Sequence, residues 1–299
     1  MPPVSIERRI LGRTGLRVSA LGFGGSETGY GGTSPEDLAR ILNDALDSGL
    51  NLIDTAACYG DGEAQLGAAI SHRRKDVILA TKCGHAAGLA GDDWDSAMIA
   101  KSIDRSLKRL RTDYVDIMQF HSPDAATLDD PRVLEVLAGA RAAGKTRFIA
   151  VSADGASALK AIELGIFDTL QISVSIADQE AIDVAIPKAH ARGMGIIAKR
   201  PLANAAWRAD SRDAYSAPYR ERLDRLRYGF LQGANTAAIA LRFTLSVPGI
   251  ACAIVGTTKP GRWAENADSL AAGPLAADQY EAIRARWRQV APPTWTGQR

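Results

Sequence analysis

Eight short apolar segments, separated by stretches with helical periodicity, constrain the fold of this chain more than any other sequence feature. These segments are continuously apolar rather than alternating, which is typical of strands buried on both faces of a parallel sheet. The stretches between them repeat apolar residues every three or four positions, as helices packed on such a sheet do. The predicted strands cover residues 19–22, 52–54, 78–82, 115–120, 148–152, 169–172, 195–199 and 252–255.

Helix end signals mark the three clearest helices. Ser34 can cap the first helix, Pro35 suits its first turn, and Gly49 follows its last apolar position. Asp95 and Asp130 precede the second and third apolar stripes, where an acidic side chain can accept hydrogen bonds from free backbone amides. Strands and helices therefore alternate along the chain.

This alternation predicts an α/β fold, a (β/α)8 TIM barrel, and we expect one such domain over residues 1–299. The segment Ile6–Leu16 has turn residues at Gly12–Gly15 between half-apolar arms, and we expect an N-terminal β-hairpin that closes the bottom of the barrel. The competing fold is an open, doubly wound sheet. It is disfavoured because the glycine cluster at Gly22–Gly25 lacks the third glycine of the dinucleotide-binding fingerprint, and the acidic residue expected after a second strand is not evident.

Charge and hydropathy limit the class of partner. The 36 basic and 34 acidic residues are mixed along the 299-residue chain and leave a net charge of +2, which favours neither nucleic acid nor an anionic membrane. The N-terminus lacks the apolar core of a signal peptide and no apolar stretch of about 18 residues follows, so we expect a cytoplasmic protein. A small-molecule partner is therefore expected, and the sequence leaves the oligomeric state open.

The cysteines favour a reducing compartment. Cys58, Cys83 and Cys252 are odd in number, and their spacing fits neither disulfide pairing nor a metal site. We therefore expect no metal ion and interpret Cys58 and Cys83 as small packing residues.

Four polar residues at or just after the ends of predicted strands form the candidate catalytic group: Asp54, Tyr59, Lys82 and His121. They should converge, because the carboxyl ends of barrel strands meet at one rim. Reduction of a carbonyl by hydride leaves negative charge on oxygen, so the reaction needs a proton donor, and Tyr59 is the candidate. Lys82 would lower the pKa of Tyr59, and Asp54 would keep Lys82 charged. His121 would hydrogen-bond the substrate oxygen or Tyr59.

The segment Leu52–Gly67, with the sequence LIDTAACYGDGEAQLG, resembles the signature of the aldo-keto reductases. The resemblance extends over nearly the whole chain, from Leu11–Gly15 to Ile254–Thr257. It implies an NADPH-dependent carbonyl reductase with a (β/α)8 barrel. It also implies that the family's catalytic Asp, Tyr, Lys and His fall on the four residues named above.

The same resemblance implies NADP(H) as the cofactor and assigns several contacts to it. Ser152 and Gln171 match the residues that hold the nicotinamide carboxamide. The residues that match the family's contacts to the adenosine 2′-phosphate and the adenine are Gly256, Thr257, Arg262 and Asn266. Lys259 either adds charge near that phosphate or is an exposed loop lysine.

Two positions depart from the family pattern. Ala153 replaces the asparagine that usually follows the serine, so the nicotinamide would depend more on Ser152 and Gln171. Lys199 and Arg200 stand where an aromatic residue usually stacks on the nicotinamide. We expect the methylenes of Lys199 to cover the ring and Arg200 to reach the cofactor pyrophosphate or an anionic substrate.

Loops above the rim should select the substrate. Trp94 and Trp207 either form aromatic walls suited to aldehydes and ketones with apolar bodies, or cover the edge of the barrel. The tail after Pro292 is short, and we assign it no role in specificity.

Three functions are compatible with this pattern. The first is reversible NADPH-dependent reduction of small aldehydes or ketones, with Tyr59 as the general acid. The second is a non-catalytic or weakly active barrel that binds NADPH and regulates a partner. The third is an aldolase in which Lys82 forms a Schiff base, and the pairing with Asp54 disfavours it because a charged amine is a poor nucleophile.

Overall fold

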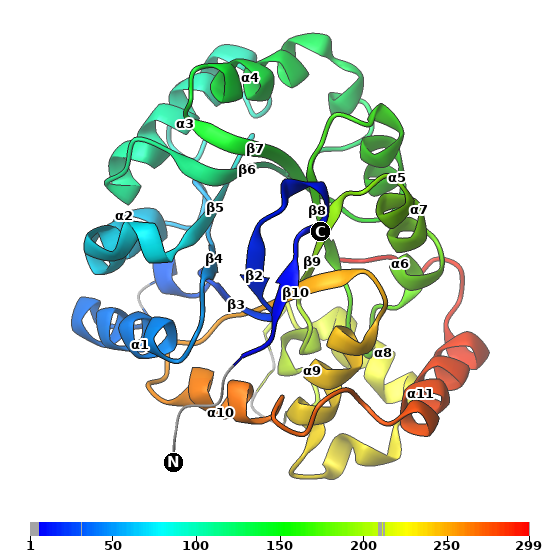
Figure 1. Cartoon of the computed structure of the whole chain (residues 1–299). Coiled ribbons are helices and arrows are strands. Elements are labelled where there is room, and N and C mark those ends of the chain that lie inside the picture. Colours follow the sequence, from blue (N-terminus) through cyan, green and yellow to red (C-terminus); the bar gives the residue numbers. More distant parts are fainter. Residues whose placement is uncertain (1–5, 31, 209–210, 212, 299) are drawn as a thin grey trace.

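The computed structural model describes residues 6–30, 32–208, 211 and 213–298, and its centre is a closed barrel of eight parallel strands (Figure 1). The barrel runs in the order β10, β3, β4, β5, β6, β7, β8 and β9, so each strand of the chain lies beside the next one. The eight strands are β3 (Leu21–Gly24), β4 (Leu52–Asp54), β5 (Ile78–Cys83), β6 (Val115–His121), β7 (Thr146–Ser152), β8 (Thr169–Ser173), β9 (Gly195–Lys199) and β10 (Ile250–Val255). The predicted (β/α)8 barrel is confirmed.

Helices connect the strands on the outside of the barrel, as Figure 1 shows. They are α1 (Pro35–Asp47), α2 (Gly62–Ile70), α3 (Ser96–Leu110), α4 (Pro131–Ala142), α5 (Gly155–Leu164), α6 (Glu180–Asp183), α7 (Ala185–Ala191), α8 (Ala217–Leu226), α9 (Thr236–Ser246), α10 (Arg262–Asp268) and α11 (Ala277–Val290). The predicted caps are confirmed, since Ser34, Asp95 and Asp130 each accept a hydrogen bond from a backbone amide of the first turn. Each cap satisfies an amide that the helix itself leaves unpaired.

An antiparallel hairpin precedes the barrel, as predicted. Its strands are β1 (Arg8–Ile10) and β2 (Arg17–Ser19), and its turn includes Gly12, which has a φ of +49°. A Cβ at Gly12 would lie 2.3 Å from the backbone nitrogen of Gly195, the first residue of β9, so only glycine allows this approach. The hairpin therefore lies against the amino-terminal end of a barrel strand, which is the bottom of the barrel.

The position of the first barrel strand differs from the sequence prediction by two residues. The predicted segment 19–22 begins with Ser19, which pairs with Arg8 in the hairpin instead. The barrel strand β3 runs over Leu21–Gly24, where Phe23 pairs with Ile53 and Gly24 with Asp54. The prediction was wrong here because only Ala20 separates β2 from β3, and the buried run from Val18 to Gly24 continues from one strand into the other.

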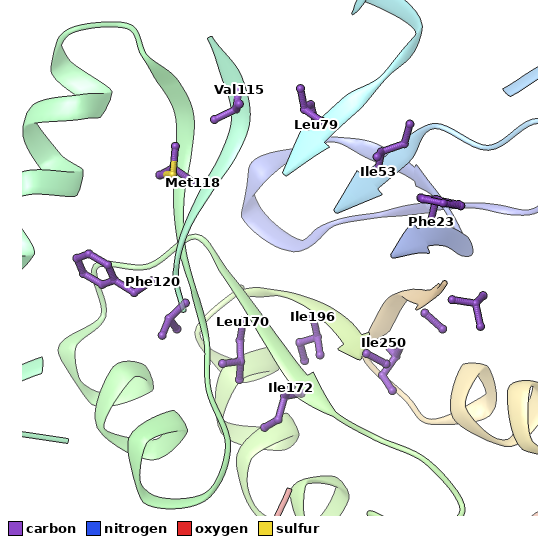
Figure 2. Packing of buried hydrophobic residues seen from close by; sticks show 14 of the residues in the cluster. Phe23, Ile53, Leu79, Val115, Met118, Phe120, Leu170, Ile172, Ile196 and Ile250 are labelled. Atoms are coloured by element: carbon purple, nitrogen blue, oxygen red, sulfur yellow. The ribbon is translucent and has the colours of Figure 1, made fainter. Parts of the chain in front are cut away.

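Two apolar layers stabilise the barrel. The larger layer lies between the strands and the surrounding helices. Figure 2 shows part of it and labels ten of its residues, including Phe23, Phe120 and Ile172. The second layer fills the barrel interior below the site and contains Leu11 of the hairpin segment together with inward-facing strand residues such as Ile117. Burying both faces of every strand explains why the strand segments read as continuous apolar runs.

The strand register places the polar strand ends at one rim. His121 of β6 pairs with Ser152 of β7, and Ser152 pairs with Gln171 of β8. Asp54 of β4 pairs with Ala80, so Lys82 stands two residues further along β5 and on the same face. Within the described residues, no helix is long and apolar enough to cross a membrane.

Candidate active site

A buried ion pair forms the floor of the site. The Nζ of Lys82 lies 2.5 Å from Oδ2 of Asp54, and the two residues are only 1 % and 2 % exposed. Lys82 also donates a hydrogen bond to the backbone carbonyl of Thr55 at 2.9 Å. Two residues from neighbouring strands, β4 and β5, are thus fixed together inside the rim.

Two amides satisfy the other carboxylate oxygen of Asp54. The Nε2 atoms of Gln119 and Gln171 donate to Oδ1 at 2.8 Å and 2.9 Å. Gln119 is two residues before His121 and therefore on the same face of β6. Gln119 is an addition to the predicted site residues, and its place two residues before His121 in a predicted strand is the signal that could have identified it.

The surroundings keep Lys82 charged. Burial opposes its charged form, but the attraction of Asp54 and a hydrogen bond with Tyr59 outweigh burial and raise the pKa of Lys82 above its ordinary value. A lysine held as an ammonium cannot act as a nucleophile, and this disfavours a Schiff-base role.

Tyr59 lies directly above this pair, in the loop between β4 and α2. Its ring centroid is 5.1 Å from Nζ of Lys82 and 5.5 Å from the ring centroid of His121. The loop is packed tightly against the neighbouring one, because a Cβ at Gly29 would lie 1.7 Å from the carbonyl oxygen of Tyr59. Gly60 has a φ of +49° and a similarly close approach to Gly29. These glycines fix the backbone that carries the tyrosine.

The pKa of Tyr59 moves in the direction opposite to the sequence-based expectation. Burial raises the pKa of this phenol, and the Lys82 ammonium opposes the shift without reversing it. The expected effect of Lys82 is present, but the loss of water contact dominates. Tyr59 is therefore protonated at neutral pH.

His121 is neutral for a similar reason. Burial and then the positive charge of Lys82 lower the pKa of this imidazole well below its ordinary value. Its Nδ1 lies 3.2 Å from Sγ of Cys58, and its ring centroid is 5.4 Å from that of His85. His85 in turn contacts the Asp93 carboxylate at 2.7 Å.

A cavity of about 730 Å³ opens above these residues. Its wall includes Asp54, Tyr59 and His121 of the candidate catalytic group, with Lys82 buried beneath them. The predicted cofactor residues that line it are Ser152, Gln171, Lys199, Arg200 and Gly256. A pocket with convergent polar groups and shifted pKa values has the character of an active site.

The donors and acceptors at the centre of the cavity suit a carboxamide. Gln171 lines the cavity and uses its Nε2 for Asp54, and among the described residues no group donates a hydrogen bond to its Oε1. The hydroxyl of Ser152 accepts a hydrogen bond from Lys199 at 3.2 Å, which leaves its own hydrogen to donate. One acceptor and one donor are thus free for an amide group, as the resemblance implies.

The ammonium of Lys199 is fixed by an ion pair. Its Nζ lies 2.9 Å from Oδ2 of Asp154, and burial lowers the pKa of Lys199 while Asp154 opposes that shift. Lys199 lines the cavity with its ammonium bound to Asp154 and Ser152, and the expectation that its methylenes cover a ring stays a prediction.

Arg200 is bound from several sides. Its Nε donates to the hydroxyl of Tyr215 at 2.8 Å, and Nη1 donates to Ser173 and to the backbone carbonyl of Gln298. The residue has a φ of +55°, a left-handed conformation that is uncommon outside glycine. These contacts hold the guanidinium in the cavity wall.

The C-terminal tail contributes to the site, which the sequence analysis did not expect. A Cβ on Gly297 would lie 2.2 Å from Oδ1 of Asp154, so the tail backbone packs directly on the carboxylate that binds Lys199. The backbone carbonyl of Thr296 accepts a hydrogen bond from Arg222 at 2.7 Å. Figure 1 shows this red segment returning from α11 to the barrel. Its shortness in the sequence gave no signal of this contact.

The remaining cofactor candidates lie on the loop and helix after β10. The backbone nitrogen of Lys259 donates to Oγ1 of Thr257 at 3.1 Å, and Asn266 is buried in α10. Arg262 forms an ion pair with Glu265 at 2.7 Å and is partly exposed. Of the candidates after β10, Gly256 belongs to the lining of the cavity described above, whereas Thr257, Lys259, Arg262 and Asn266 do not.

The two tryptophans do not line the cavity. Trp94 packs on Phe120 and His85, and Trp207 packs on a separate apolar cluster. Besides Tyr59 and His121, the aromatic residues in the wall are Tyr30 and Tyr215, which are 70 % and 57 % exposed. These packing contacts agree with the second of the two alternatives, cover of the barrel edge, and a role of either tryptophan in substrate selection stays a prediction.

Comparisons with known proteins agree on one family. A sequence profile of the aldo/keto reductase family matches residues 20–288. L-galactose dehydrogenase of Arabidopsis thaliana is 31 % identical over 284 residues, covering 87 % of both chains. 6-dehydroglucose reductase of Novosphingobium aromaticivorans is 30 % identical over 278 residues, covering 88 % of this chain and 90 % of its own. The structure of aldo-keto reductase AKR11C1 from Bacillus halodurans, in its holo form, has a TM-score of 0.80 at 26 % identity and covers 94 % of this chain and 96 % of its own.

Proposed function

Since this chain belongs to the aldo/keto reductase family, we propose that it reduces small aldehydes or ketones with NADPH and oxidises the corresponding alcohols in the reverse direction. The observation that carries the proposal is the buried pair of Lys82 and Asp54 beneath Tyr59, at the floor of a cavity of about 730 Å³. This arrangement places a phenol beside a fixed ammonium at the rim where barrel enzymes react.

Tyr59 is the proton donor in this proposal. A nicotinamide cofactor held in the cavity would supply the hydride, and the protein would then have to protonate the carbonyl oxygen as negative charge grew on it. Burial keeps Tyr59 protonated, as a general acid must be, and Lys82 stabilises the phenolate that remains after the proton has moved. Asp54 keeps Lys82 charged throughout the cycle.

His121 orients the carbonyl group. Its imidazole lines the cavity and is neutral, because burial and nearby cations lower its pKa. A neutral imidazole can donate one hydrogen bond to the substrate oxygen without adding a charge that would compete with Lys82. The substrate oxygen would then lie between Tyr59 and His121.

The residues of the cavity fit a nicotinamide cofactor. The free acceptor of Gln171 and the free donor of Ser152 match the amine and carbonyl of a carboxamide. Arg262, Lys259 and Asn266 would hold the adenosine end, and the two cations favour a 2′-phosphate over a hydroxyl. This supports NADPH over NADH.

The cavity wall supports a polar substrate. Ser122, Asn204 and Asp213 line it together with Tyr30 and Tyr215. Two of the relatives are named for L-galactose and for 6-dehydroglucose. Within the class of small aldehydes and ketones, we therefore favour compounds that carry several hydroxyl groups over those with apolar bodies.

The direct experiment is a screen of carbonyl compounds. Purified protein and NADPH are mixed with hydroxylated and with alkyl aldehydes and ketones, and the loss of NADPH absorbance is followed. We expect turnover, faster with the hydroxylated set. Tight NADPH binding without oxidation by any compound would contradict the proposal and favour the regulatory alternative.

A further inference from the structure

Cys58 makes a contact that the proposed mechanism does not yet use. Its Sγ lies 3.2 Å from Nδ1 of His121, which is close for a hydrogen bond to sulfur. The residue is half-buried in the loop directly before Tyr59, and its own backbone carbonyl accepts a hydrogen bond from the Tyr30 hydroxyl at 3.3 Å. The loop is therefore fixed from two sides.

The direction of the hydrogen bond follows from the chemistry of the two groups. Burial raises the pKa of the Cys58 thiol, which stays protonated, and His121 is neutral. A neutral imidazole has one nitrogen that donates and one that accepts. Thiol sulfur is only a weak acceptor whereas an unprotonated imidazole nitrogen is a good one, so the favoured arrangement has S–H donating to Nδ1.

The other side of the ring is free. Among the described residues, Nε2 of His121 has no hydrogen-bond partner, and the imidazole lines the cavity. Lys82, Lys199, His85 and Arg200 all oppose a second proton on the ring. The ring thus has one proton, and its position depends on what Nδ1 contacts.

We propose that Cys58 is a positioning residue whose thiol donates to Nδ1 of His121 and thereby keeps the imidazole proton on Nε2, where it can hydrogen-bond the substrate oxygen. The proposal deepens the carbonyl reductase function and rests on it. Without the thiol, the proton can move to Nδ1, and Nε2 would then present a lone pair to the substrate oxygen and repel it.

The first test compares two substitutions at this position by kinetics. Cys58→Ala removes the donor, and we expect kcat to fall by about tenfold or more, as a wrong tautomer does elsewhere. Cys58→Ser keeps a donor of similar size, and we expect it to restore most of kcat. The affinity for NADPH should not change in either variant. A serine variant no better than the alanine variant, or an alanine variant with unchanged kcat, would overturn the proposal.

The second test reads the tautomer directly and does not need turnover. In protein labelled with 15N-histidine, the chemical shifts of the two ring nitrogens of His121, assigned with His121→Gln, distinguish Nε2–H from Nδ1–H. We expect Nε2–H in the parent and in Cys58→Ser, and a mixture in Cys58→Ala. An unchanged Nε2–H tautomer in Cys58→Ala would contradict the proposal. If no carbonyl compound is reduced, the proposed function fails, and this test still decides the role of Cys58.

Cys83→Ala is the matched control. Cys83 is next to Lys82 in the sequence, and its described sulfur contact, at 3.6 Å, is with the Gln119 backbone carbonyl rather than with His121. Its substitution removes a thiol near the site, and we expect the His121 tautomer to stay as in the parent. Circular dichroism of all variants excludes loss of the fold as the cause of a change.

Discussion

Lys82 and Asp54 form an ion pair inside the barrel, with 2.5 Å between Nζ and Oδ2 and almost no exposure of either side chain. Removing one partner leaves the other charge buried without compensation, which typically costs about 3–5 kcal/mol. We therefore expect Lys82→Met to lower the free energy of unfolding by roughly this amount, measured by urea denaturation.

The double variant Asp54→Asn/Lys82→Met is the control for this effect. It removes both charges and keeps an amide that can still accept from Gln119 and Gln171. Its stability should return toward that of the parent. A single variant as stable as the double one would mean that the pair contributes no net electrostatic stabilisation.

The neutral state of His121 makes stability depend on pH. Burial lowers the pKa of His121 in the folded protein, so the unfolded chain takes up the proton first as the pH falls. The stabilisation that comes from neutral His121 is fully present above about pH 6.5. It is lost as the pH falls below this value, and the free energy of unfolding then changes by up to about 1.4 kcal/mol per pH unit. Unfolding free energies at pH 7.5 and 5.5 should show a smaller drop for His121→Gln than for the parent. The control His72→Gln, at an exposed position, should show the same drop in unfolding free energy as the parent. Equal drops in the parent and both variants would refute the assignment of this pH dependence to His121.

The tail contact makes Gly297 sensitive to the smallest side chain. A Cβ there would lie 2.2 Å from Asp154 and would push the carboxylate away from Lys199. Because Lys199 bonds Ser152, a proposed carboxamide contact, we expect Gly297→Ala to weaken NADPH binding about fivefold, corresponding to about 1 kcal/mol. Fluorescence titration measures this affinity. Gly139→Ala, where a Cβ meets open space, should bind like the parent, and equal affinity of both variants would rule out the tail's role.

The proposed preference for NADPH depends on Arg262. This residue pairs with Glu265 at 2.7 Å and keeps further guanidinium donors for a phosphate. Arg262→Ala should raise the KM for NADPH about tenfold and leave the KM for NADH nearly unchanged. Arg40→Ala, a surface arginine of α1, is the control. A parallel rise of both KM values in Arg262→Ala would exclude recognition of the 2′-phosphate by this residue.

The fold was predictable because its signals are local. Continuous apolar runs identified all eight barrel strands, and caps such as Ser34 identified helix starts. The boundary at Ser19 was wrong because pairing partners, not residue types, decide whether a residue joins the hairpin or the barrel.

The candidate site was predictable only where the topology itself brings residues together. Asp54 and Lys82 stand at the ends of adjacent strands, so their meeting follows from the barrel. The contacts of Cys58 with His121 and of Gly297 with Asp154 depend on loop and tail conformations that no periodicity encodes. Loop conformation also decides whether Trp94 faces the pocket or covers the edge of the barrel, so the sequence left both alternatives open.

Tyr59→Phe is the most direct measurement of whether this phenol supplies the proton. Phenylalanine keeps the ring between Lys82 and His121 and removes only the hydroxyl. With a carbonyl compound that the parent reduces, kcat should fall by about two to four orders of magnitude while NADPH affinity stays within a few-fold of the parent. A variant that oxidises NADPH as fast as the parent would contradict the role of Tyr59 as the general acid.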